Sequence, residues 1–435
     1  MMILDKLNKV RQSKNIRNSF WIIGEQVFQM LLAFVVGTLS ARYLGPSNYG
    51  TLNYTASFVS FFINIASLCM EGVVIKKLVD HPESEGVYLG SSLFFRIISS
   101  FLSMISIAII VYILDPGDSL KLLLAAIQSI QLFFKSFNIF DTWFQRMLKS
   151  KYTSIGKMVA SISVSGYKLF LLITSKSIIW FAFSTIISDL IIAVILYIFY
   201  KREGGQSLKI NITVGKEVLS ESYHFVLSDM MAALYMNMDK IMIGQMMTDR
   251  DVGLYITATT ISGLWAFIPV AMINSYRPTI IELKKTSEDQ YRKRLTQLYS
   301  LIIWVSIMFA LISFLFAELI IKILYGMEYI DAVDALKITV WGQMFAVISM
   351  TRSVWIICEN KNKYVKYYVA IGTIVNLILN FILIPTVGIV GAAVATLITN
   401  MVVLIFAPLL YRETRSQIQY LLHGFFMTWV WSRGR

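Results

Sequence analysis

The chain has 435 residues, of which 57% are hydrophobic and 15% charged, with a formal net charge of +13. Soluble domains are about 45–50% apolar, and this chain, with a mean hydropathy of +0.66, is excluded from that class. Its apolar stretches do not alternate with the two-residue period of barrel strands. The predicted fold class is therefore an all-α polytopic membrane protein.

Twelve apolar stretches follow one another along the chain, each about as long as the 17–25 residues that cross the bilayer as a helix. In chain order they are 19–39, 51–72, 89–113, 120–140, 157–174, 178–200, 223–246, 252–275, 296–317, 332–357, 367–384 and 388–410. The longest loop, 201–222, divides them six and six. We therefore predict a cytoplasmic amphipathic arm at 1–18, six-helix lobes at 19–204 and 205–411, and a cytoplasmic tail at 412–435 that includes an interfacial helix.

Lysine and arginine are distributed unequally between the two predicted sides of the membrane. With the N-terminus inside, 27 of the 39 basic residues fall in inside segments and 4 in outside segments, and the other 8 lie within the spans. Because basic residues concentrate in cytoplasmic loops, both ends of the chain are predicted to be cytoplasmic. The same distribution accounts for the positive charge without a nucleic-acid partner, since nucleic-acid binders gather their charge on one face.

Two predicted hairpins have similar sequences. The first turns through "LGPSNYGTLNYTAS" at 44–57 and the second through "MTDRDVGLYITATT" at 247–260. In both, a polar turn leads to glycine (Gly50, Gly253), then Leu, Tyr and small hydroxyl residues. Six helices per half would make this a parallel repeat; the alternative is hairpin chemistry shared without duplication.

The stretch "NLILNFILIPTVGIVGAAVATLITN" at 376–400 predicts two packed helices. Pro385 is expected to end the first helix, because proline removes a backbone donor, and Gly388 to form the turn. Small residues from Gly391 onward predict backbone-close packing, as in other membrane helix pairs. Three asparagines lie in this apolar stretch: Asn376, Asn380 and Asn400. We interpret them as interhelical hydrogen-bond donors and acceptors, with substrate contact as the alternative.

Charged side chains inside spans are functional candidates, because each costs about 2.5–3.5 kcal/mol at a span's centre on insertion scales. The predicted substrate-binding residues are Arg96, Arg352, Lys168, Lys240, Ser99 and Ser103, with Arg42 and Arg277 at the rims. Arginine suits a phosphate group because its planar fork binds two oxygens at once. For Arg96, Arg352 and Lys168 the alternative is that the side chain snorkels to the headgroups.

Three carboxylates are predicted candidates for ion coupling: Glu25, Asp229 and Asp239. Glu25 and Asp229 are too short to snorkel, and they precede Gly50 and Gly253 by similar distances in the sequence. For Asp239 the alternative is an internal salt bridge. Lys135 is expected to pair with Asp141 at the inner end of its helix.

Four stretches together resemble the Wzx-type polysaccharide repeat-unit flippases of the MOP superfamily, relatives of the MATE exporters and of the peptidoglycan-precursor flippase. They are "ARYLGPSNYGTLNY" (41–54), "NMDKIMIGQMMTDRDVGLYITA" (237–258), "ILYGMEYIDAVDALKI" (323–338) and the stretch at 376–400. The resemblance covers nearly the whole chain except its last two dozen residues. It implies two six-helix bundles forming a V around a central cavity that opens alternately to either side.

The resemblance also implies a function. The chain is expected to move an undecaprenyl-pyrophosphate-linked oligosaccharide from the cytoplasmic to the periplasmic or outer leaflet of a bacterial inner membrane, for O-antigen and lipopolysaccharide or for capsule and exopolysaccharide. Expected partners are that substrate, membrane lipids, a polysaccharide polymerase and a chain-length regulator. Proton exchange, a sodium gradient and pull from downstream polymerisation all fit as energy sources.

Two other functions are considered. A MATE-type cation-coupled exporter of small molecules shares the architecture. A membrane polymerase or acyltransferase would need a large outer loop or a buried His/Asp constellation, and the sequence has neither. With three histidines, no metal-spaced cluster and no Gly-rich phosphate loop, we expect no enzyme activity, cofactor or metal.

Overall fold

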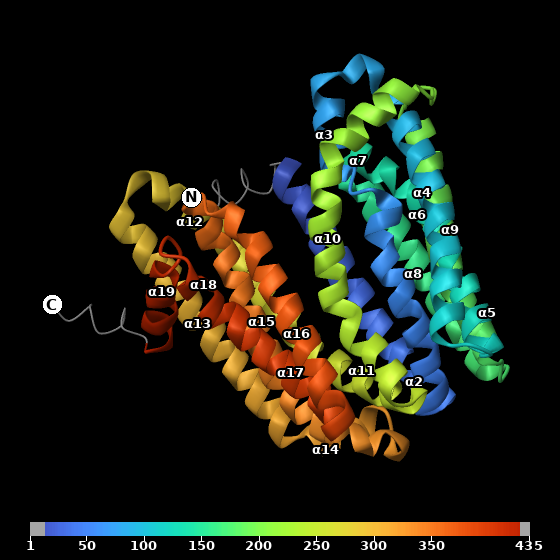
Figure 1. Cartoon of the computed structure of the whole chain (residues 1–435). Coiled ribbons are helices and arrows are strands. Elements are labelled where there is room, and N and C mark those ends of the chain that lie inside the picture. Colours follow the sequence, from blue (N-terminus) through green and yellow to red (C-terminus); the bar gives the residue numbers. More distant parts are fainter. Residues whose placement is uncertain (1–13, 427–435) are drawn as a thin grey trace, which may run out of the picture. The chain divides into compact units, whose positions relative to one another are not determined.

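The computed structural model describes residues 14–426, and this part of the chain is helical with short connections and no strands (Figure 1). The predicted all-α fold class is confirmed. The arm predicted at 1–18 lies largely outside the described residues, as does the end of the tail predicted at 412–435.

Two compact units make up the chain. The first holds the chain up to Leu44 together with Thr51–Ala233, and the second holds Gly45–Gly50 and the chain from Leu234 onward. The division falls inside helix α10 (Ile212–Met246). The lobe boundary at 204/205 stays a prediction.

The elements before α10 are α2 (Lys14–Ser67), α3 (Glu71–Asp80), η1 (Pro82–Ser84), α4 (Glu85–Leu114), α5 (Ser119–Ser129), α6 (Gln131–Lys135), η2 (Ser136–Asn138), α7 (Ile139–Arg146), α8 (Ser150–Ile173) and α9 (Ile178–Arg202). Those after α10 are α11 (Asp249–Gly263), η3 (Leu264–Ala266), α12 (Phe267–Thr286), α13 (Glu288–Leu315), α14 (Ala317–Leu324), η4 (Met327–Ala332), α15 (Val333–Cys358), η5 (Asn362–Tyr364), α16 (Val365–Val387), α17 (Ile389–Met401), η6 (Val402–Phe406), α18 (Ala407–Leu410) and α19 (Ser416–Phe425).

Ten helical segments of the described chain are long and apolar enough to cross a membrane. The first of them, Gly24–Asp80, contains the span predicted at 51–72 and the span predicted at 19–39 except for its first five residues. The span predicted at 223–246 lies in α10, which is not among the ten; Asp229, Asp239 and Lys240 make it more polar than the others. The chain is a multi-pass membrane protein, and the number twelve stays a prediction.

The segment 45–50 belongs to the second unit and packs against α11. Gly45 breaks α2 with a φ of 70°, a conformation that favours glycine. A Cβ at Gly50 would lie 1.7 Å from the carbonyl oxygen of Asp249, and one at Gly253 would lie 2.0 Å from that of Pro46. Gly50 therefore contacts Asp249, the residue four positions before Gly253, and Gly253 contacts Pro46, the residue four positions before Gly50. This reciprocal contact explains why both positions need glycine, and the repeat itself stays a prediction.

The hairpin of α16 and α17 is packed as tightly as its small residues predict. A Cβ at Gly391 would lie 2.2 Å from the carbonyl oxygen of Leu383, so no larger residue fits. Gly388 forms the turn with a φ of 68°. The predicted helix end at Pro385 is wrong. The helix α16 continues to Val387, and the Gly388 N–H bonds to the Ile384 carbonyl at 2.9 Å, because proline removes only its own backbone donor.

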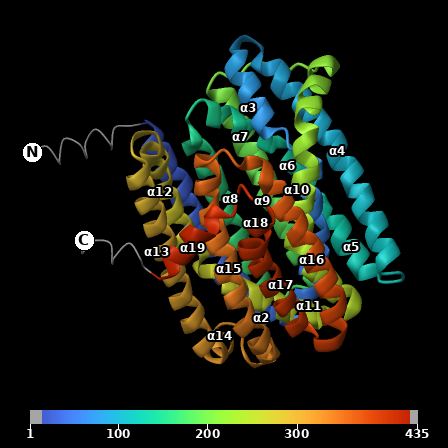
Figure 2. The same cartoon turned by 60° about the vertical axis from the view of Figure 1, so that its left-hand side comes forward.

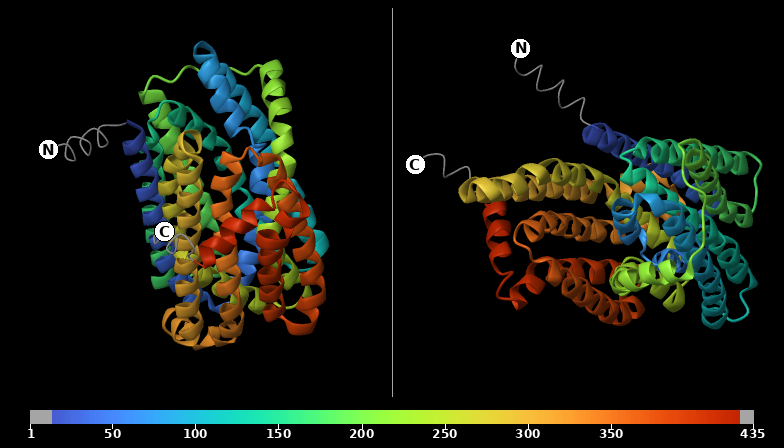
Figure 3. Two further views of the ribbon diagram at one scale, coloured as in Figure 1. Left: turned by 90° about the vertical axis from the view of Figure 1, so that its left-hand side faces the viewer. Right: turned by 90° about the horizontal axis from the view of Figure 1, so that it is seen from above.

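The connection between α9 and α10, 203–211, is held against α4 in the first unit and can be followed in Figure 3. The Lys209 N–H donates to the Gly86 carbonyl at 3.1 Å, and the Asn211 N–H donates to the Ser91 hydroxyl at 2.9 Å. A Cβ at Gly86 would lie 2.3 Å from the carbonyl oxygen of Ser207. Of the longest predicted loop, 201–222, only 203–211 is a connection, which is fixed against α4; the rest belongs to α9 and α10.

Part of the predicted tail forms α19, which packs against α13 in the second unit (Figure 2). Gly424 allows this approach, since its Cβ would lie 2.8 Å from that of Tyr299. The Trp304 and Phe425 rings stack at 6.0 Å. Just before α19, ion pairs from Lys361 and Lys363 reach Glu413. The Lys361 and Tyr364 hydrogen bonds lower the pKa of Glu413 to about 2.

Candidate functional site

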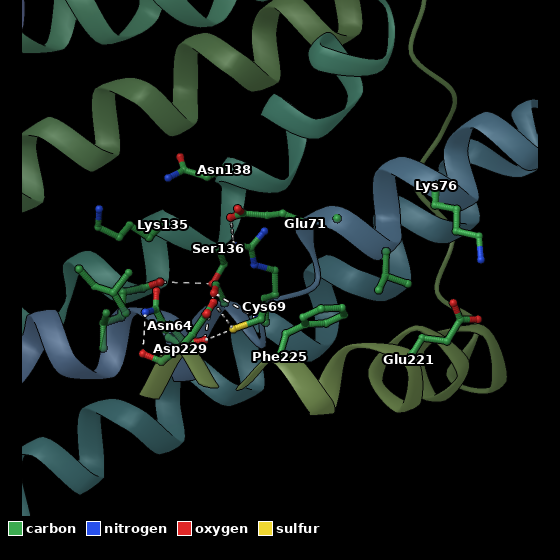
Figure 4. A pocket seen from close by; sticks show the side chains of 17 residues that line it. Asn64, Cys69, Glu71, Lys76, Lys135, Ser136, Asn138, Glu221, Phe225 and Asp229 are labelled. Atoms are coloured by element: carbon green, nitrogen blue, oxygen red, sulfur yellow. Dashed lines mark hydrogen bonds and ion pairs between the residues drawn. The ribbon is translucent and has the colours of Figure 1, made fainter. Parts of the chain in front are cut away.

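A pocket of about 690 Å³ lies within the first unit (Figure 4). Its lining residues are Ile63, Asn64, Ala66, Ser67, Cys69, Glu71, Gly72, Val73, Lys76, Arg96, Leu132, Lys135, Ser136, Asn138, Glu221, Phe225 and Asp229. They come from α2, α3, α4, α6, η2 and α10. We call this the headgroup pocket. Its volume falls within the ~300–1,000 Å³ of small-molecule sites.

A break in the chain between α2 and α3 forms one wall of the headgroup pocket. Leu68 and Cys69 have φ values of 53° and 48°, which are uncommon for residues with a side chain. Irregular backbone at membrane depth is tolerated where it lines a cavity, and Ser67 and Cys69 do line this one. The span predicted to run to residue 72 therefore ends at Ser67, and a new helix starts at Glu71.

Arg96 is buried at this pocket, on α4, and is 2% exposed. One guanidinium nitrogen, Nη2, lies 3.2 Å from the Glu71 carboxylate, whereas Nε and Nη1 are buried without a partner among the described residues. The side chain does not snorkel to a headgroup. Ser99 and Ser103 lie on the same helix but do not line the pocket: Ser99 donates to the Ile65 carbonyl at 2.8 Å, and the buried Ser103 hydroxyl has no partner in the described part of the chain.

Asp229 is brought to the same pocket as Arg96. The thiol of Cys69 donates to its carboxylate at 3.3 Å, and the amide of Asn64 donates to its backbone carbonyl at 3.5 Å. The carboxylate is exposed to the pocket. The structure therefore combines one predicted cation and one predicted coupling acid in a single pocket.

Glu25 lines a second pocket in the first unit, of about 600 Å³, which shares Lys135 and Asn138 with the headgroup pocket. It is 5% exposed. The predicted pairing of Lys135 with Asp141 is wrong. Lys135 pairs instead with Asp189 on α9 at 3.7 Å, and Asp141 pairs with Lys157 at 3.6 Å. Contacts between different helices decide both pairs.

Arg352 lines a smaller pocket, of about 290 Å³, within the second unit. It is 7% exposed, and its guanidinium carbon lies 4.4 Å from the centre of the Tyr368 ring, a cation–π contact. Nη1 donates to the Val403 carbonyl at 2.7 Å. Val403 belongs to η6, a π-helical turn, where the helix bonds are shifted. The described residues give Arg352 no acidic partner, and snorkelling is excluded for it as for Arg96.

Asp239 is the centre of a polar cluster in the second unit. Its carboxylate accepts hydrogen bonds at 2.6 Å from Asn380 on α16, Tyr255 on α11 and Thr396 on α17. Asp239 makes no salt bridge within the described residues, so the alternative of an internal salt bridge is wrong. Asn380 also donates to Asn376 at 3.0 Å.

Asn400, the third asparagine of this hairpin, likewise joins helices. Its amide donates to the Gly342 carbonyl on α15 at 3.1 Å, and its oxygen accepts from the Tyr235 hydroxyl on α10 at 2.7 Å. The interpretation as interhelical hydrogen-bonding residues is confirmed for Asn380 and Asn400, whereas the bond from Asn380 to Asn376 lies within α16.

The other predicted cations are dispersed. Lys240 follows Asp239 in the sequence, but its ammonium group donates to the side-chain oxygen of Asn237, on the same helix, at 3.5 Å. Arg277 donates to Ser353 on α15, which lines the Arg352 pocket. Lys168 is half-buried on α8 and Arg42 is exposed on α2; neither lines a pocket described above.

Several residues of these sites were not predicted. In the sequence Glu71 lies at the end of a predicted apolar span. Nothing in the sequence marks the helix break just before it, because the chain turns at leucine and cysteine rather than at glycine or proline. Asp189 lies inside an apolar span and is a candidate by the same rule that selects Arg96. Nothing in the sequence marks Tyr255 or Thr396 as a hydrogen-bond partner of Asp239.

Comparison with known proteins identifies the family to which this chain belongs. Residues 16–284 match the family described as "Polysaccharide biosynthesis protein". The chain belongs to this family. Residues 225–382 also match the MatE family. The predicted membership of the polysaccharide branch of the MOP superfamily is confirmed.

Two relatives match this polysaccharide biosynthesis protein over different shares of its length. The capsular polysaccharide biosynthesis protein CapF of Staphylococcus aureus is 21% identical over 408 residues, covering 92% of this chain and 99% of CapF. The probable low-salt glycan biosynthesis flippase Agl15 of Haloferax volcanii is 26% identical over 185 residues, covering 42% of this chain and 39% of Agl15. The lipid II flippase MurJ, in an inward closed conformation, has a TM-score of 0.71 at 15% identity, covering 95% of this chain and 92% of MurJ. The fold is that of MurJ.

Proposed function

We propose that this chain is a flippase that moves an undecaprenyl-pyrophosphate-linked oligosaccharide repeat unit from the cytoplasmic to the outer leaflet of a bacterial inner membrane, by alternating access. Its product would supply O-antigen, capsule or exopolysaccharide synthesis, with a polymerase and a chain-length regulator acting after it. Both termini would be cytoplasmic. Membership of the polysaccharide family supports the pathway, and the names of CapF and Agl15 support a role in glycan assembly.

The observation that carries the proposal is a buried arginine in a pocket whose lining includes charged and polar side chains, inside an apolar unit. Arg96 lines the headgroup pocket, and two of its buried guanidinium nitrogens have no partner among the described residues. A lipid-linked sugar needs such an environment only for its pyrophosphate and oligosaccharide, because the polyprenyl tail is soluble in the bilayer. Flipping makes and breaks no covalent bond, so the proposal includes no enzymatic step. The positioned cations and hydrogen-bonding groups suffice.

Coupling belongs to the same proposal. Asp239 accepts hydrogen bonds from three neutral partners and has no counter-ion among the described residues, so we take it as the coupling candidate of the second unit. Glu25 and Asp229 stay candidates in the first unit, at two pockets that share a wall. A proton or a sodium ion is the proposed coupling ion.

Loss of the gene from its host tests the function. We expect surface polysaccharide to disappear and the lipid-linked repeat unit to accumulate in the inner leaflet, measured by extracting the lipid and labelling its sugar in intact and opened cells. Re-expression of the chain should reverse both effects. Normal surface polysaccharide together with reduced efflux of small cationic compounds would contradict the proposal and favour a MATE-type exporter, which the MatE match over 225–382 keeps as the second candidate.

A further inference from the structure

The headgroup pocket contains an anion-binding arrangement that the chain itself occupies. Its first component is the N-terminus of α3, a helix of 10 residues. The first helical bond runs from the Val74 N–H to the Met70 carbonyl, so the preceding N–H groups have no helical acceptor. No side chain caps this end. Helix N-termini with free N–H groups attract anions.

The second component is Arg96, which is independent of α3. Its buried Nε and Nη1 have no partner in the described part of the chain. Leaving buried donors of a charged group unpaired is costly, and a ligand oxygen would satisfy them. Close approach to the α3 backbone is sterically open as well, because a Cβ at Gly72 would meet nothing within 4 Å.

Glu71 joins the two components. It is the first residue of α3, and its carboxylate lies 3.2 Å from Arg96 Nη2. In Figure 4 its side chain reaches toward Ser136 and Asn138, while Lys76 and Glu221 lie at the far end of the pocket. The Glu71 side chain is 59% exposed, whereas that of Arg96 is 2% exposed. The arginine is thus fixed by the protein and the carboxylate can move away.

We propose that Glu71 is an internal stand-in for the substrate's phosphate: it neutralises Arg96 in the empty pocket and is displaced when a phosphate or pyrophosphate group binds between Arg96 and the N-terminus of α3. The inference rests on the proposed function for the identity of the lipid that carries the phosphate. Exchange of one anion for another avoids leaving Arg96 uncompensated in the empty state. It also makes Glu71 a competitor that lowers the affinity for the ligand.

Binding of two probes to the purified full-length protein in detergent tests the exchange. Inorganic pyrophosphate reports the anion site, and farnesyl pyrophosphate reports the same site with a lipid tail. Glu71→Gln keeps the shape and removes the competing charge, so we expect affinity for both probes to rise about fivefold, the effect of removing one partly exposed ion pair. In an Arg96→Gln background the same change should alter affinity less than twofold, because the two residues act through one contact.

Glu217→Gln is the matched control. Glu217 also belongs to α10 and pairs with Lys77 instead of Arg96, but it does not line the headgroup pocket. Its neutralisation should change affinity less than twofold. An equal rise in Glu217→Gln would make the effect general electrostatics and overturn the proposal, as would unchanged affinity in Glu71→Gln or no binding of either probe. Size-exclusion profiles identical to that of the wild type establish that the variants are folded.

The two probes separate the sources of the phosphate. Binding of farnesyl pyrophosphate with the expected Glu71 effect supports a lipid headgroup; exclusion of farnesyl pyrophosphate while inorganic pyrophosphate binds would overturn the assignment to a lipid. Transport of lipid-linked oligosaccharide is measured separately in proteoliposomes. If the wild type binds both probes as expected but transports nothing, the anion site stands and the flippase function is rejected. If the wild type transports the lipid but Glu71→Gln does not change the affinity, only the proposed anion exchange is rejected.

Discussion

Replacement of Arg96 by alanine should abolish export of surface polysaccharide. Loss of a buried charge-assisted contact costs about 2 kcal/mol or more, equivalent to at least a ~30-fold fall in transport rate. Lysine at this position should restore transport only in part, because it keeps the charge but loses the planar fork that binds two phosphate oxygens. Export is measured as surface polysaccharide per cell, normalised to the amount of the protein in the membrane.

Arg292→Ala serves as the control for Arg96→Ala. Arg292 is 64% exposed on α13 and pairs with Glu288 one turn away, so its removal should leave export unchanged. Full export by Arg96→Ala at a normal protein level would mean that the headgroup pocket does not hold the substrate's charge.

Replacement of Asp239 by asparagine should remove the response of transport to an ion gradient. Three donors at 2.6 Å surround the carboxylate, and asparagine offers them one oxygen and an amide that is itself a donor. In proteoliposomes, an imposed pH gradient and an imposed sodium gradient are tested separately. The gradient that accelerates the wild type should have no effect on the variant, while slow gradient-independent movement continues.

Asp331→Asn is the matched control for charge removal in the second unit. Asp331 pairs with Arg250 at 2.7 Å, and both side chains are at least half exposed. Its neutralisation should leave the gradient response intact. An unchanged response in Asp239→Asn would make the cluster structural, and Glu25 and Asp229 would then be the coupling candidates to test.

Much of the fold could be predicted because the membrane imposes a simple rule: backbone donors and acceptors must be satisfied inside a helix. Hydropathy therefore located nearly every helix. It failed where local geometry departs from composition. The break at Leu68 and Cys69 contains neither glycine nor proline, and α16 continues past Pro385.

Only some residues of the candidate sites could be predicted, and their arrangement could not. The cost of burying charge selected Arg96, Arg352 and Asp239, and all three are largely enclosed by protein. Their partners come from other helices: Glu71 for Arg96, and Asn380 among the donors to Asp239. Sequence spacing carries no information on which helices meet. For the same reason the partner expected for Lys135 was wrong.

The most direct test of the flippase function is movement of the substrate by the purified protein. Proteoliposomes containing the chain and a pyrophosphate-linked oligosaccharide in the inner leaflet are exposed to a membrane-impermeant glycosidase added outside. The wild type should make the inner-leaflet sugar accessible to the enzyme, and Arg96→Ala should leave it protected as in protein-free liposomes. Equal protection in wild-type and protein-free liposomes, with correctly folded protein present, would contradict the proposal that this chain is a flippase.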